Sequence, residues 1–80
     1  MSYNIPDYTR EAIDAYVQHR IPVGGFLTAV LTNNLFEAFA RADDNNIAAM
    51  FDIVRYIYNE TPAVCWGSTE AVTKWLEGKE

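Results

Sequence analysis

Apolar side chains recur along this chain with the spacing that is typical of helices. Between residues 9 and 19 they follow the i, i+3, i+4 rule and form one stripe, made of Ala12, Ile13, Tyr16 and Val17. The hydroxyl of Thr9 suits an N-cap, so the first helix is predicted to cover residues 9–19. Pro22 and the glycine pair that follows it then favour a turn.

A longer apolar face runs through residues 26–41 and predicts one long second helix. The residues on this face are Leu27, Val30, Leu31, Leu35, Ala38 and Ala42, with the polar Asn34 among them and Phe26 and Phe39 at its edges. Asn33 and Asn34 stand midway along this helix. Short amide side chains compete with the hydrogen bonds of the backbone, so this pair is where such a helix would kink.

Two further helices complete the predicted fold. Residues 44–59 form the third, which Pro62 ends, and Ser68 caps a short last helix over residues 69–77. The side chains expected inside are Ile47, Met50, Phe51, Val54, Ile57, Tyr58, Val72, Trp75 and Leu76. The sequence therefore predicts one all-α domain over residues 1–80. In it, a long antiparallel helical hairpin is flanked by a short N-terminal and a short C-terminal helix.

The size of the chain favours assembly into a homo-oligomer. A domain of 80 residues buries only about 60% of the surface that its unfolded chain exposes, and is marginal alone. One cysteine and one histidine provide neither an internal disulfide nor a structural zinc site. Eleven aromatic residues (two Trp, five Tyr and four Phe) exceed what so small a core hides easily. Partner subunits are the remaining source of stability.

Charge and hydropathy narrow the range of partners. The net charge is −5, and the six Lys and Arg residues are scattered, so binding to a DNA or RNA polymer is not expected. No apolar run reaches the roughly 18 residues that a membrane span needs. The polar N-terminus does not resemble a signal peptide, and the single cysteine suits a reducing cytosol.

Residues that could support catalysis or bind metal are sparse. His19 is the only imidazole and ends the first helix, and Cys65 stands in an apolar setting that raises rather than lowers a thiol pKa. The run Asp43-Asp44-Asn45-Asn46 lacks the glycine and glutamate of a calcium-binding loop, and favours a helix-capping turn. We therefore expect neither an enzyme nor a metal or cofactor site.

Two loops are candidates for ligand binding. In the first, Gly24 and Gly25 precede a helix whose unpaired N–H groups suit a phosphate oxygen. Arg20 is the nearby cation, and Tyr8 and Phe26 offer flat faces for a base, although a plain turn also explains the glycines. In the second loop, Trp66 either closes the core or contacts another subunit.

Several of these segments together resemble a group of small helical phage and prophage proteins, the anti-CBASS sponge family. The segments are residues 21–31 with Asn33, Asn34 and Leu35, then Arg41-Ala42-Asp43, Tyr58-Asn59-Glu60 and Cys65-Trp66-Gly67-Ser68. The resemblance covers residues from about 8 to 76. It implies a hexamer in the host bacterial cytoplasm that binds cyclic di- and trinucleotide immune signals without cleaving them, and so blocks CBASS defence.

The resemblance also implies a set of ligand-binding residues. Tyr8 would stack on a base, and the glycine pair with Phe26 would frame the pocket. Val23 stands where some relatives carry a basic residue, which leaves Arg20 as the nearest cation. The full predicted set is Tyr8, Arg20, Pro22, Val23, Gly24, Gly25, Phe26, Trp66 and Ser68. An acidic phage protein that inhibits a host protein by direct binding is the alternative.

Overall fold

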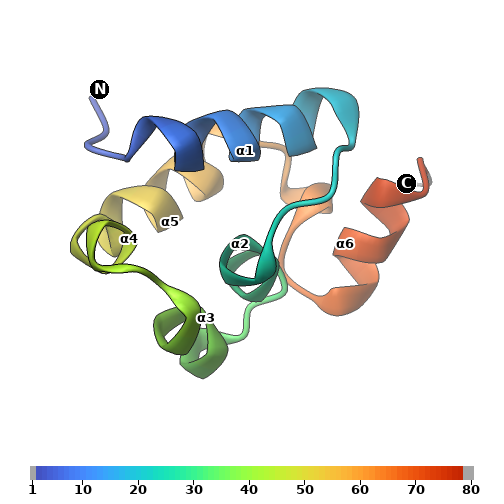
Figure 1. Ribbon diagram of the computed structural model, residues 1–80. Helices are drawn as coiled ribbons and strands as arrows, with labels where there is room; N and C mark the ends of the chain where they lie inside the picture. Colours follow the sequence, from blue (N-terminus) through green and yellow to red (C-terminus); the bar gives the residue numbers. More distant parts are fainter. Residues whose placement is uncertain (1, 79–80) are drawn as a thin grey trace.

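Helices form where the apolar spacing predicts them, but two of the four predicted helices are each divided in two. The computed structural model describes residues 2–78, and this part of the chain is all-α (Figure 1). Its elements are α1 (Asp7–His19), α2 (Gly25–Leu31), α3 (Leu35–Arg41), α4 (Asp44–Ala48), α5 (Met50–Glu60), the 3-10 turn η1 (Ala63–Cys65) and α6 (Thr69–Leu76).

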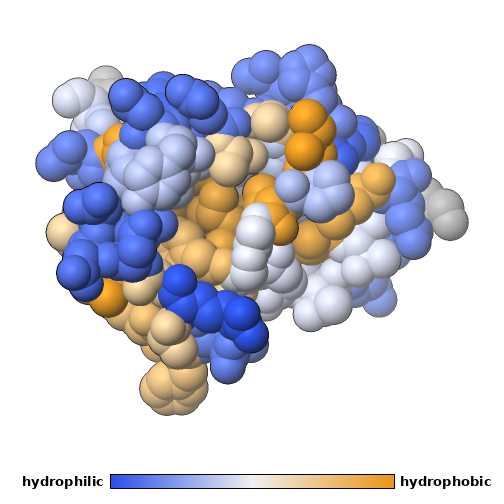
Figure 2. Space-filling view, viewed as in Figure 1, coloured by the Kyte–Doolittle hydropathy of each residue, from blue (hydrophilic) through white to orange (hydrophobic). Residues whose placement is uncertain are grey.

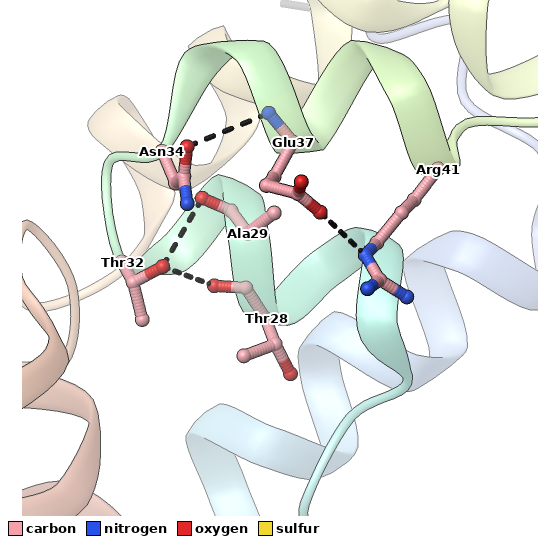
Figure 3. Close-up of polar contacts among 6 residues, drawn as sticks. All are labelled: Thr28, Ala29, Thr32, Asn34, Glu37 and Arg41. Atoms are coloured by element: carbon pink, nitrogen blue, oxygen red, sulfur yellow. Dashed lines mark hydrogen bonds and ion pairs between the residues drawn. The ribbon is translucent and has the colours of Figure 1, made fainter.

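The long second helix was predicted wrongly, because the chain reverses at the Asn33-Asn34 pair. Asn33 adopts the left-handed conformation with φ 64°. Its N–H donates to the carbonyl of Val30 (3.1 Å), and the N–H of Asn34 donates to that of Ala29 (2.8 Å). These two bonds form the Schellman motif that ends a helix. The Asn34 side chain then accepts from the N–H of Glu37 and caps α3 (Figure 3).

As a result, α2 and α3 form a short antiparallel hairpin. The side chain of Arg41, in the last turn of α3, lies against Gly25, the first residue of α2. The third predicted helix is divided less severely, at Ala49, into α4 and α5. Ser68 caps α6 as predicted, because its hydroxyl accepts from the N–H of Ala71 (3.0 Å).

Helix α1 lies across the other helices and is joined to them by buried hydrogen bonds (Figure 1). The hydroxyl of Tyr16 donates to the carbonyl of Cys65 (2.7 Å), and Trp75 Nε1 donates to the carbonyl of Tyr16 (2.9 Å). Burial, with a smaller effect of Cys65, raises the pKa of Tyr16 to about 12, so its hydroxyl stays a donor. Thr9 is not the predicted N-cap, since α1 begins at Asp7, and its hydroxyl instead donates to Asn46 Oδ1 (2.6 Å).

The core is smaller than predicted. Its completely covered side chains are Tyr16, Ile13, Leu31, Ile53 and Cys65. Six side chains of the third helix were expected inside, and this was wrong for four of them, since Ile47, Phe51, Val54 and Tyr58 are exposed. Leu35 and Phe39 on α3 are exposed as well. Within α5 the buried side chains are Met50, Ile53, Tyr56 and Ile57, so a different face of this helix is turned to the core than the one expected.

The turn at Asn33 gives a stability prediction. A left-handed conformation costs a residue with a Cβ roughly 1–2 kcal/mol, and Asn and Gly tolerate it best. We expect Asn33→Ala to lower the free energy of unfolding by about 1 kcal/mol, while Asn33→Gly leaves it unchanged or raises it. Urea unfolding followed by circular dichroism measures both variants. Equal stability of the two would contradict the left-handed turn.

Candidate functional site

The start of α2 is accompanied by a cation that the sequence did not predict. Gly24 is the N-cap, and no side chain caps this helix of seven residues. Arg41 Nη1 lies 3.1 Å from the position that a Cβ on Gly25 would occupy, so the absence of a side chain there makes room for the guanidinium. Arg41 also donates to Glu37 Oε2 (2.8 Å), as Figure 3 shows. Only the reversal at Asn33 brings these two ends together.

Arg20, the cation predicted for the glycine loop, instead holds α6 against α1. Its Nη1 donates to the carbonyl of Trp75 (2.8 Å), and its guanidinium lies 3.9 Å from the centre of the Trp75 ring. Arg20 has the left-handed φ of 57° that ends α1. These contacts give Arg20 a structural role.

Tyr8 is held at the opposite end of α1 by a contact with Asp43. Its hydroxyl donates to Asp43 Oδ2 (2.6 Å), and the other oxygen of Asp43 accepts from the N–H of Asn46 (2.7 Å) to cap α4. The bond from Tyr8, followed by that from Asn46, lowers the pKa of Asp43. The same bond and burial raise the pKa of Tyr8. The Tyr8 ring remains half-exposed, but the hydroxyl has a partner.

The other predicted site residues divide between loop and core. Pro22 and Gly24 are exposed, whereas Val23 and Phe26 are half-buried and pack against the main core. Ser68 caps α6. The structure therefore brings Pro22, Val23, Gly24, Gly25 and Phe26 together, as their sequence positions require, and gives Tyr8 and Arg20 partners elsewhere.

Trp66 is half-buried, packs against the main core and forms one wall of an apolar pocket. Its ring centre lies 5.7 Å from that of Tyr58, and its Nε1 is buried without a hydrogen-bond partner in the described part of the chain. The Trp66 loop is joined to α2 by the N–H of Gly67, which donates to the carbonyl of Leu31 (2.7 Å). From sequence, Trp66 was expected either to close the core or to contact another subunit. Its position is compatible with both roles.

The pocket has a volume of about 280 Å³ and lies between α2, α3, α5 and the Trp66 loop. Its lining is mostly apolar, and among the described residues no charged side chain contributes to it. The lining residues are Ala29, Val30, Asn33, Asn34, Leu35, Ala38, Met50, Val54, Ile57, Tyr58, Trp66 and Gly67. The pocket thus combines two aromatic rings with two amides in an otherwise apolar wall.

Several apolar side chains of α3 and α5 are exposed, and three of them, Leu35, Val54 and Tyr58, line this pocket. We name them the α3–α5 apolar surface; its members are Leu35, Phe36, Phe39, Phe51, Val54 and Tyr58. Phe36 is 86% exposed and Phe51 74%. Apolar side chains also reach the surface over α3 in the lower part of Figure 2. The sequence pattern missed this surface because it assigned most of these positions to the core.

Cys65 and His19 have the positions that the sequence predicted for them. Cys65 is completely buried, and burial raises the pKa of its thiol. His19 is exposed at the end of α1. Among residues 2–78, no three His, Cys, Asp or Glu side chains gather in a group that could hold a metal ion. The same residues include no helix with the length and apolar character needed to cross a membrane.

Comparison with protein-family models, with curated proteins and with solved structures returned no match to this chain. The geometry above and the sequence resemblance are therefore the basis for a functional proposal.

The role of Arg20 is testable by its effect on stability. Arg20→Ala removes a charge-assisted hydrogen bond and a cation–π contact, and we expect it to lower the free energy of unfolding by on the order of 2 kcal/mol. Arg41→Ala is the matched control, because Arg41 is exposed and bonds only within α3, and we expect a change below about 0.5 kcal/mol. Urea unfolding measures both. A larger loss for Arg41→Ala would reverse the two assignments.

The contact between Tyr8 and Asp43 gives a pH prediction. The pKa of Asp43 is lowered in the folded state, so its stabilising effect is present above the unfolded pKa and is lost as the pH falls through the folded pKa. Tyr8→Phe removes the main cause, and we expect the pKa of Asp43 to rise toward the ordinary value of a carboxyl. A carboxyl-carbon NMR titration measures it. Tyr58→Phe is the control and should leave the Asp43 titration unchanged.

Proposed function

We propose that this protein is a non-catalytic binding protein, and that its ligand site is the apolar pocket together with the α3–α5 apolar surface. The observation that carries the proposal is the pocket itself, about 280 Å³ in volume, with Trp66 and Tyr58 in its wall and with Phe36 and Phe51 exposed on two of the helices that line it. Ligand sites in proteins are mostly apolar hollows with a few polar groups that orient the ligand. Exposed apolar patches of this kind mark binding surfaces.

The lining favours a flat ring with polar edges, such as a nucleobase. Aromatic side chains stack on bases with roughly 1–3 kcal/mol for each base. The amide of Asn33 offers donors and an acceptor, and that of Asn34 offers its donors while its oxygen caps α3; both suit the edge of a base. Tyr58 and Trp66 are therefore the residues proposed to stack, in place of Tyr8 and Phe26, because Tyr8 is bonded to Asp43 and Phe26 packs against the core.

The proposed ligand is a cyclic di- or trinucleotide immune signal, and the proposed role is its sequestration without cleavage. The resemblance to the phage anti-CBASS sponges supports this ligand class, together with action as a homo-oligomer, a hexamer by that resemblance, in the host bacterial cytoplasm. The pocket supplies no cation. Stacking and amide hydrogen bonds would therefore provide the affinity, with the phosphates left toward solvent.

A second candidate function is inhibition of a host protein by direct binding. The observation that favours it is the exposure of Phe36 and Phe51, since aromatic side chains are enriched in protein interfaces. The two candidates differ in one measurable property, because an inhibitor of this kind needs no small ligand.

A thermal-shift panel of cyclic di- and trinucleotides tests the proposed function. We expect at least one of them to raise the melting temperature, since a ligand of the folded state stabilises it. The bound ligand is then released by heat and identified by chromatography. Intact ligand supports sequestration, cleaved ligand indicates an enzyme, and the absence of any shift favours the protein inhibitor.

Two variants locate the site by calorimetric titration of the ligand found in that panel. Tyr58→Ala removes a stacking ring that is itself exposed, and we expect it to weaken binding by roughly tenfold or more. Tyr8→Ala should leave the affinity unchanged. The opposite result would move the site from the pocket to the region of the Tyr8–Asp43 contact.

A further inference from the structure

The α3–α5 apolar surface is about as large as half of a stable protein interface. Covering an aromatic side chain removes roughly 150–250 Å² from water, so its four partly exposed aromatics offer on the order of 500 Å². Leu35, Val54 and the walls of the pocket extend this area toward the roughly 800 Å² that each partner contributes to a standard interface. The largest apolar patch of a typical monomer covers about 300–600 Å².

The charges around this surface suit a second copy of the same chain. Each copy has a net charge of −5, so two copies repel unless they meet through an uncharged face. None of the six surface residues is charged. The carboxylates that directly follow Phe36 and Phe51 in the sequence are those of Glu37 and Asp52. Each is paired within its own helix, Glu37 with Arg41 (2.8 Å) and Asp52 with Arg55 (3.2 Å). The face and its nearest charges are thus close to neutral.

The same surface also contains both a protruding group and a hollow. Phe36 is 86% exposed and directly follows Leu35, which lines the pocket. A cavity of roughly 150 Å³ holds a benzene ring, so a pocket of about 280 Å³ has room for a phenyl group. In an interface with a two-fold axis, each partner presents the same patch, and a protruding group of one copy can fill the hollow of the other.

We infer that two copies of this chain pair through the α3–α5 apolar surface, and that Phe36 of each copy packs into the apolar pocket of the other. This inference rests on the proposed function in one respect, because it uses the same pocket and names the subunit contact of the proposed homo-oligomer. In the pair, a ligand would share the pocket with Phe36 or displace it. The occupant of the surface is therefore a second copy rather than a different protein.

Sedimentation equilibrium of the full chain, from micromolar to millimolar concentration, tests the inference. We expect wild-type protein to have a mass of twice 9.1 kDa or a larger even multiple. Phe36→Glu places a carboxylate in the proposed contact, and we expect at least a twofold fall in the assembled mass with unchanged helical circular dichroism. Ile21→Glu is the matched control, since Ile21 is half-exposed outside this surface, and it should keep the wild-type mass.

Phe51→Glu, on α5, is a second test of the same contact surface in case Phe36→Glu does not fold. The inference is overturned if wild-type protein remains a 9.1-kDa species at every concentration, which leaves the surface to a different protein. It is also overturned if every folded variant keeps the wild-type mass. The nucleotide panel separates the two proposals: self-association without ligand binding contradicts the proposed ligand and leaves the inference standing. Ligand binding by a monomer contradicts the inference and the proposed homo-oligomer, and leaves the proposed ligand standing.

Discussion

The chain reversal at Asn33 is the constraint on which the rest of the structure depends. A left-handed residue followed by a capping asparagine ends α2 and starts α3 within three residues. Because of this reversal, α3 returns along α2, Arg41 reaches Gly25, and Asn33 and Asn34 contribute to the pocket wall. A continuous helix over residues 26–41 would be about 24 Å long. Its end would then lie far from Gly25, and the pocket would not form.

The exposed phenylalanines of α3 follow from the same reversal. In a domain of this size, the core has room for few large side chains, and the helices α1, α5 and α6 with Leu27 and Leu31 of α2 already fill it. Helix α3 covers only a second, smaller cluster of Ala29, Ala38 and Met50. Its larger apolar residues therefore face outward beside those of α5. The α3 part of the apolar surface is thus a consequence of the packing of α3 on α2, at positions whose sequence pattern indicated a core helix.

Sequence periodicity predicted the existence and class of the helices, together with the caps at Asp43 and Ser68, because these depend on neighbours within four residues. It placed a kink at the Asn33-Asn34 pair but missed the chain reversal there, because the apolar spacing from Leu31 to Leu35 and Ala38 continues through it as in a single helix. Whether Asn33 kinks a helix or reverses the chain is decided by tertiary packing. The predicted ligand residues were separated for a similar reason. Tyr8 and Arg20 bond to Asp43 and Trp75, which lie 35 and 55 positions further along the chain, and local spacing contains no information on such partners.

The distribution of charge explains how an acidic chain can combine these features. Its four arginines make internal contacts: Arg20 on Trp75, Arg10 on Tyr56, Arg55 on Tyr3 and Phe51, and Arg41 with Glu37. These cations are scattered along the sequence and do not form a basic patch for a polyanion, and the proposed ligand would bind the uncharged pocket through ring faces and amides instead. An uncharged face is also where two acidic copies repel each other least. In the proposed homo-oligomer, a flat ligand would share the apolar pocket with Phe36 of a second copy or displace it, and the wall that α3 gives to this pocket follows from the position of α3.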